Sequence, residues 1–251
     1  MNTFSSPSMG WRGHLGKISP APVPGRFVRE FYEAVPEGID ITVASLLVQK
    51  VAKKDMDEMM SMVGRTAEVL AEKGVHAIYL GGVPPIVMKH PGYDLEVVEE
   101  LRKASGLPAS TDMTGVMDAF RALGLKRLVM STPFEGWVND LIKKYVAPAG
   151  FDIVHMGGIP LASGSERKAL PAHVEYTFTR EVFRQCSEEV DGIYIPCPGW
   201  GTIHNIARME QDLGKPVVTW FNAMIWWFLT TTGVKAPIRG FGTLLESIGA
   251  D

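Results

Sequence analysis

The chain has 251 residues, of which 46% are hydrophobic, enough to build a core as one large domain or two small ones. The net charge of −3 and the pI of about 6.1 provide no electrostatic basis for binding nucleic acid or an anionic membrane. It has two cysteines, no apolar run of the roughly 20 residues that span a bilayer, and no apolar N-terminal segment. We therefore expect a cytoplasmic protein without a disulfide framework.

Short β-forming runs alternate along the chain with longer segments of helical spacing. The predicted strands lie at 14–19, 38–46, 75–82, 125–132, 151–158, 190–197 and 214–220, and the predicted helices at 55–74, 95–105, 115–123, 137–145, 171–190 and 203–213. The first of these helices carries one apolar stripe, typical of core packing, made of Met56, Met59, Met60, Val63, Ala67 and Leu70. Alternating strands and helices predict the α/β class, with parallel sheets covered on both faces.

Three pairs of segments repeat in the same order. HAIYLGGVPP (76–85) resembles DGIYIPCPGW (191–200), GLPASTDMTG (106–115) resembles GKPVVTWFNA (214–223), and LGKISP (15–20) has a counterpart in LKRLVMSTP (125–133). The repeat predicts two similar parallel-sheet halves related by a pseudo-twofold axis. Because ligands bind outside the carboxyl ends of parallel strands, we expect Gly82 and Cys197, which the first pair aligns, to face each other across an active-site cleft.

These segments, together with EKGVHAIYLGG and the tail GVKAPIRGFGTLLE, resemble the aspartate/glutamate racemase superfamily. Within it, the pattern is similar first to arylmalonate decarboxylase and next to maleate isomerase, along residues 15–245. The resemblance implies that both chain ends share one half, made of residues 1–113 with 217–251, and that residues 114–216 form the other.

The resemblance also implies a chemistry. Superfamily members with two cysteines place one thiol on each face of the substrate, whereas arylmalonate decarboxylases pair a glycine with one cysteine. Here the two positions are Gly82 and Cys197, because Cys186 falls within a predicted helix. In the family, the lone cysteine protonates the enediolate left when a disubstituted malonate loses CO₂, and the uncharged neighbours of Cys197 favour a protonated thiol. The alternative is that Cys197 is a small core residue.

Several positions depart from the decarboxylase pattern. Val83 and Pro84 stand where hydroxyl side chains are expected, Phe134 replaces a tyrosine, and Pro198 removes a backbone N–H. Each lost oxyanion donor costs about 2.7–4 kcal/mol of transition-state stabilisation, so either other donors have replaced them or the reaction differs. Candidates, whose alternative role is capping and turn formation, are the backbone N–H groups of Gly82 and Val83 and the side chains of Ser19, Ser45, Ser131, Thr132, Thr219 and Asn222.

The resemblance further implies that Pro20, Gly199 and Trp200 contact the substrate. Phe134 and Trp200 are expected on the rim of the cleft, which suits a bulky or aromatic substrate group. If Gly82 is a vacant thiol position, a Gly82→Cys variant is expected to gain proton exchange at the α-carbon of a carboxylic acid.

The leading predicted function is a cofactor-independent decarboxylase, a lyase, that acts on a substituted malonate-like carboxylic acid. An isomerase or racemase of the same superfamily and a catalytically silent binding protein are the alternatives. The sequence contains no G-x-G-x-x-G, P-loop or H-x-x-x-H motif, so no nucleotide or metal cofactor is predicted. The expected partner is a small carboxylic acid, with no nucleic acid and no membrane, and a homo-oligomer stays open.

Overall fold

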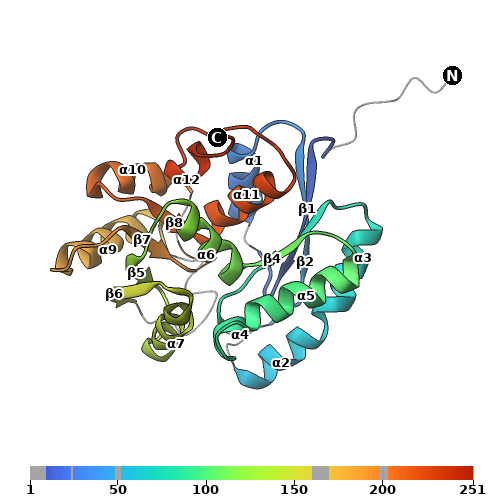
Figure 1. Ribbon diagram of the computed structural model, residues 1–251, viewed down its shortest axis with the longest axis horizontal. Helices are drawn as coiled ribbons and strands as arrows, with labels where there is room; N and C mark the ends of the chain where they lie inside the picture. The colour runs from blue at the N-terminus through green and yellow to red at the C-terminus, as the bar shows by residue number, and fades with distance from the viewer. Residues whose placement is uncertain are drawn as a thin grey trace.

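The structure, a computed structural model, describes residues 10–23, 25–48, 52–159, 170–197, 200 and 203–250. Within these residues the strands form two parallel four-stranded sheets (Figure 1). The first sheet has the order β2-β1-β3-β4 and the second β6-β5-β7-β8, so one strand order occurs twice. This confirms the predicted α/β class with two similar parallel-sheet halves. The strands are β1 (Gly13–Ser19), β2 (Ile39–Ser45), β3 (Ala77–Leu80), β4 (Ala109–Thr111), β5 (Arg127–Thr132), β6 (Asp152–Gly158), β7 (Gly192–Ile195) and β8 (Val217–Thr219).

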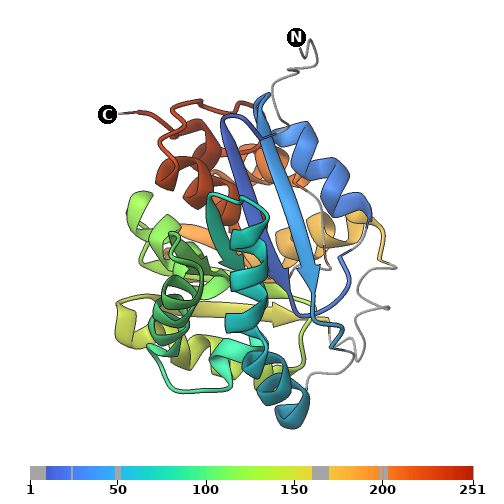
Figure 2. The same ribbon diagram turned by 90° about the vertical axis from the view of Figure 1, so that its right-hand side faces the viewer.

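Helices surround both sheets, and β6 runs across the direction of β1 and β2, so the two sheets are turned relative to each other (Figure 2). The helices that precede β4 are α1 (Gly25–Ala34), α2 (Lys53–Ser61), α3 (Val63–Glu72), α4 (Pro84–Val87) and α5 (Tyr93–Ser105). The later ones are α6 (Asp112–Ala122), α7 (Gly136–Val146), the 3₁₀ turn Ala147–Ala149, α9 (Ala172–Gln185), α10 (His204–Leu213), α11 (Trp220–Thr231) and α12 (Thr243–Glu246).

Helices α6 and α11 join the two halves. Each follows the last strand of one sheet and begins at a threonine cap, Thr111 for α6 and Thr219 for α11. Phe120 of α6 then packs against Tyr194 of the second sheet, with ring centroids 5.2 Å apart. Trp227 of α11 packs against Tyr79 of the first sheet at 5.5 Å. The two helices also contact each other, so one core extends through both halves.

Some elements differ from the prediction. The helix predicted at 55–74 is two helices, α2 and α3, which meet at the partly exposed Met62. The apolar stripe stays buried across this break, because both helices turn the same side to the core. Strand β4 was missed because three residues are too few for a periodic pattern. Helix α1 was missed although Phe27, Phe31 and Ala34 have the spacing of a buried helical face.

Residues 217–251 were predicted to belong to the first half. They begin with β8, whose hydrogen bonds join it to β7 of the second sheet. The C-terminal part of the first half therefore begins after Thr219, while the wider division of the chain stays a prediction. Among the described residues, no helix is long and apolar enough to cross a membrane. The same residues contain no group of three or more His, Cys, Asp or Glu side chains that could hold a metal ion.

Candidate active site

Two corresponding loops follow β3 and β7. β3 ends at Leu80, and residues 81–83 lead directly into the short helix α4. β7 ends at Ile195 and is followed by Pro196 and Cys197. β3 and β7 occupy the same place in the two sheet orders, so the two loops are structural counterparts.

Gly82 combines an unusual backbone conformation with a lack of space. Its φ angle is +106°, in the left-handed region that favours glycine. A Cβ atom at this position would lie only 2.5 Å from Pro20 Cγ and 3.4 Å from Pro85 Cγ. Pro20 therefore fills the space that the Cβ of a cysteine at position 82 would need. Such a cysteine fits only if Pro20 moves.

Cys197 and its aromatic neighbour Trp200 are buried, with 2% and 3% of their surfaces exposed. The chain turns directly after the cysteine, because the Trp200 N–H donates to the Cys197 carbonyl oxygen at 3.4 Å. Trp200 packs against Phe178 of α9, with ring centroids 5.7 Å apart. Phe134 is also buried, so the structure places both predicted rim residues in the apolar core. Pro198 and Gly199 lie outside the described residues.

A buried carboxylate lies behind the first loop. Asp112, the first residue of α6, accepts a hydrogen bond from the Gly82 N–H at 2.5 Å through Oδ2. Burial raises the pKa of Asp112, and the Lys17 charge and the Gly82 N–H oppose that rise. Burial raises the pKa of Tyr194 as well, and electrostatic interactions with Asp112 and Cys197 raise it further. Tyr194 thus lies within electrostatic reach of Asp112, behind the first loop, and of Cys197 in the second.

Most of the proposed hydroxyl donors already have partners. Ser19 Oγ donates to the Ala21 carbonyl at 2.7 Å, and Thr132 Oγ1 donates to Asn139 Oδ1 at 2.7 Å. The buried Ser131 Oγ accepts from Thr179 of α9 at 2.9 Å. Thr219 and Asn222 form the capping box of α11, and Ser45 is half-buried at the end of β2. The contacts of Ser19, Thr219 and Asn222 are of the capping and turn kind, whereas Ser131 instead bonds to α9.

Two other donors remain near the loops. The buried Trp200 Nε1–H has no hydrogen-bond partner among the described residues. The Val83 N–H likewise makes no hydrogen bond within the described part of the chain. Pro84 and Pro85, which open α4, have no N–H. Because Asp112 occupies the Gly82 N–H, Val83 supplies the backbone donor that remains on the first loop. The sequence indicated Trp200 as an apolar contact and missed its unpaired N–H.

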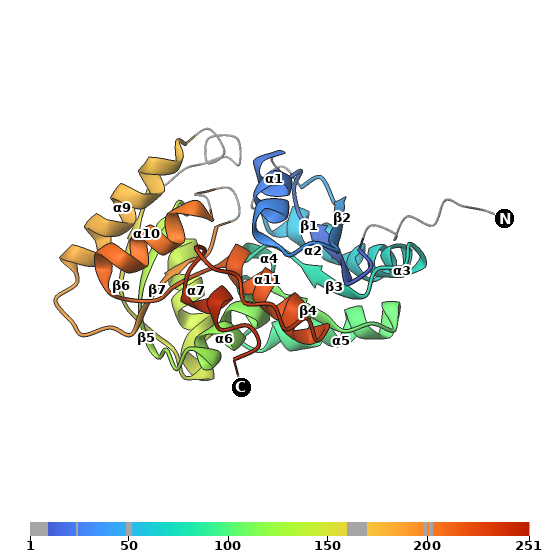
Figure 3. The ribbon, with the colours of Figure 1, turned by 90° about the horizontal axis from the view of Figure 1, so that it is seen from above.

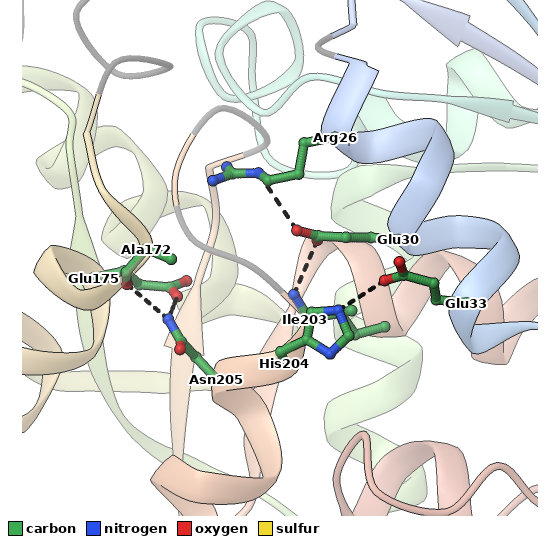
Figure 4. Close-up of polar contacts among 8 residues, drawn as sticks. All are labelled: Arg26, Glu30, Glu33, Ala172, Glu175, Ile203, His204 and Asn205. Carbon is green, nitrogen blue, oxygen red and sulfur yellow. Dashed lines mark hydrogen bonds and ion pairs between the residues drawn. The ribbon is translucent and has the colours of Figure 1, made fainter.

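Helix α10, which begins after the Cys197 loop, is joined to α1 of the first half by a hydrogen bond and an ion pair (Figure 3, Figure 4). The buried Glu30 accepts from the Ile203 N–H at 3.1 Å and pairs with Arg26 at 3.4 Å. One turn further along α1, Glu33 lies 2.9 Å from His204 Nε2. The Glu30 carboxylate occupies the start of α10, where the positive end of the helix dipole would otherwise attract an anion.

Most of the chain is similar to proteins of one family. A sequence model described as arylmalonate decarboxylase matches residues 15–245. Arylmalonate decarboxylase of Bordetella bronchiseptica is 24% identical over 92% of this chain and 96% of its own length, and maleate isomerase of Pseudomonas putida is 21% identical over 84% and 86%. A maleate cis-trans isomerase from Nocardia farcinica with a covalently bound succinylcysteine intermediate shares the fold, with a TM-score of 0.85, 16% identity and coverage of 94% and 98%. The chain belongs to the arylmalonate decarboxylase family.

Proposed function

We propose that the protein is a cofactor-independent decarboxylase of a substituted malonate-like carboxylic acid. One observation carries this proposal: the buried thiol of Cys197 follows β7, whereas Pro20 closes the corresponding position after β3 at Gly82. A single thiol suits a reaction in which one proton is delivered to one face of an intermediate. The similarity to arylmalonate decarboxylase supports the same chemistry.

In the proposed reaction, the bond between the α-carbon and one carboxyl group breaks and CO₂ leaves. The electron pair of that bond stays on the α-carbon and the remaining carboxylate as an enediolate. Cys197 Sγ–H donates its proton to the α-carbon, and a proton from water restores the thiol. Because one thiol serves one face, a substrate with two different substituents is expected to yield predominantly one enantiomer.

The negative charge of the enediolate needs hydrogen-bond donors. We assign this role to Trp200 Nε1–H and Val83 N–H, which belong to opposite loops and have no partners among the described residues. Donors held in a buried region act strongly on developing charge, because little water screens them. Each donor is worth about 2.7–4 kcal/mol of transition-state stabilisation. Two such donors would offset much of what the missing hydroxyl side chains supply.

The alternatives make different demands on the first loop. A two-thiol isomerase or racemase needs a side chain at position 82, which the φ angle of Gly82 and the contact with Pro20 disfavour. The similarity to maleate isomerase keeps a cis-trans isomerisation as the second candidate. A silent binding protein would retain the loops and turn over no substrate.

The reaction can be identified by incubating the protein in D₂O with monosubstituted and disubstituted malonates, maleate and amino acids. CO₂ release with one deuterium at the α-carbon is the expected result. Conversion of maleate to fumarate without CO₂ would identify an isomerase instead. Binding without turnover of any compound would favour the silent homologue.

Cys197→Ser tests the role of the thiol. Serine is a far weaker acid, so turnover should fall about 10²–10⁴-fold, while substrate binding persists. A buried hydroxyl also costs about 1–3 kcal/mol of stability, so turnover must be measured per folded molecule, with the folded fraction taken from circular dichroism. The matched control is Cys186→Ser, at the partly exposed end of α9, which should remain fully active. A folded and fully active Cys197→Ser would rule out the proposed proton donor.

A further inference from the structure

An ionisable amine and a carboxyl group are buried behind the first loop. Lys17 of β1 is 1% exposed and Asp112 of α6 is 0% exposed. Lys17 Nζ lies 3.5 Å from Met224 Sδ and over the rings of Trp220, Tyr79 and Phe27, at 4.8, 5.4 and 5.5 Å from their centroids. Burial lowers the pKa of Lys17 and raises that of Asp112, and each charge opposes the shift of the other. The two charges therefore support each other.

The backbone of the first loop lies directly against this pair. A Cβ atom on Gly81 would come within 2.8 Å of Lys17 Nζ, so a side chain at this position fits only if the end of Lys17 moves. The next residue, Gly82, gives its N–H to Asp112. On α6, a Cβ atom on Gly115 would lie 2.6 Å from the Tyr79 hydroxyl, so Gly115 makes room for that group beside Asp112.

The second half has no such pair at the corresponding positions of the sequence. In the sequence repeat, Lys17 corresponds to Met130 and Asp112 to Trp220. Both halves nevertheless form the same strand order, and both helices begin at a capping threonine. The fold of a half therefore does not require these charges. Since apolar residues of similar size often stabilise a core as well as buried ionisable groups do, Lys17 and Asp112 point to a local role in the first half.

We propose that Asp112, with its charge balanced by Lys17, is a positioning residue that fixes the first loop through the Gly82 N–H. This orientation leaves the adjacent Val83 N–H as the donor for the substrate's developing charge, a step that rests on the proposed function. The hydroxyls of Tyr79 and Tyr194 and Asp112 Oδ1 are buried without hydrogen-bond partners among the described residues. The hydrogen bond from the Gly82 N–H to Asp112 Oδ2 is short, at 2.5 Å, and a charged carboxylate strengthens such a bond.

The anchor itself is testable without any substrate. In the NMR spectrum of the full chain, the Gly82 amide proton should resonate unusually far downfield because of its short bond to a carboxylate. Asp112→Asn should move this resonance upfield, since a neutral amide oxygen accepts more weakly. The control is Asp118→Asn, further along α6, where the carboxylate pairs with Arg121 at 2.7 Å. It should leave the Gly82 resonance in place. An unchanged Gly82 resonance in Asp112→Asn would overturn the proposal.

The positioning role is tested with Asp112→Asn, Lys17→Met and their double variant. Either single change leaves one buried charge without its partner and should lower Tm, whereas the double variant removes both charges and should recover Tm. If Asp112 positions the loop, kcat in the double variant should stay about 10²-fold lower, with KM much less affected, despite the recovered Tm. Recovery of kcat together with Tm would show a structural pair only and would overturn the proposal. If the parent protein turns over no substrate, the decarboxylase function fails, and the NMR comparison still decides the anchor.

Discussion

The buried indole N–H of Trp200 has no hydrogen-bond partner among the described residues. Leaving a buried donor unsatisfied costs about 1–3 kcal/mol, and folded proteins retain few such groups. In the proposed function, an oxyanion of the substrate would be the acceptor of this N–H. A polar group that weakens the free protein would then strengthen the complex.

Trp200→Phe separates these two effects. Phenylalanine keeps an aromatic ring in the core and removes the unpaired N–H, so the free energy of unfolding should change by less than about 2 kcal/mol. Turnover should fall about 10²–10³-fold, as is typical for the loss of one oxyanion donor. Trp137→Phe is the control, because Trp137 is 43% exposed on α7 and its Nε1–H donates to Glu135. Equal turnover in the two variants would exclude Trp200 as a donor.

Gly82→Cys is expected to fail as a simple restoration of a second thiol. The left-handed φ angle and the 2.5 Å approach of the new Cβ to Pro20 Cγ both oppose it. Overpacking alone should lower the free energy of unfolding by about 1–3 kcal/mol, measured by urea denaturation. Combining it with Pro20→Gly relieves the contact, so α-proton exchange in D₂O is expected to appear in the double variant. A fully stable single variant would show that Pro20 does not close the position.

At the level of elements, α1 of the first half contacts the start of α10, the helix that follows the Cys197 loop. Glu30 acts on the start of α10 much as a capping side chain does, although it comes from another helix. Glu30→Ala should therefore lower the free energy of unfolding by about 1–2 kcal/mol. Glu33→Ala is the control, because the Glu33–His204 pair is exposed and should contribute at most about 1 kcal/mol. Equal urea midpoints for the two variants would contradict the capping role of Glu30.

At the level of the whole molecule, α6 and α11 each connect the two halves. Each helix leaves one sheet and packs an aromatic residue against the other, as Phe120 does on Tyr194 and Trp227 on Tyr79. The loops after β3 and β7 belong to sheets that share this core, so neither loop is supported by one half alone. This arrangement explains how two repeated segments can contribute to one site.

The sequence predicted the local features of this fold well. Apolar strands and the spacing of Met56, Met59 and Met60 are properties of neighbouring residues, and the structure buries them as expected. The repeat of IYL in β3 and IYI in β7 predicted two similar halves. Strands at equivalent positions of two similar sheets have similar buried surroundings, so they carry similar residues. The prediction missed β4, because it has only three residues. It also missed the break between α2 and α3 at Met62, because the apolar stripe continues across the break.

The sequence by itself determined the α/β class, the repeat and the correspondence of the loops after β3 and β7, because each depends on residue order and periodicity. Tertiary structure alone decided that Pro20 fills the space beside Gly82, that Asp112 occupies its N–H, and that Trp200 has an unpaired donor. These facts depend on distances between segments far apart in the chain, and Gly82 and Asp112 are separated by 30 positions. No local pattern records such distances; packing of the two halves into one core sets them.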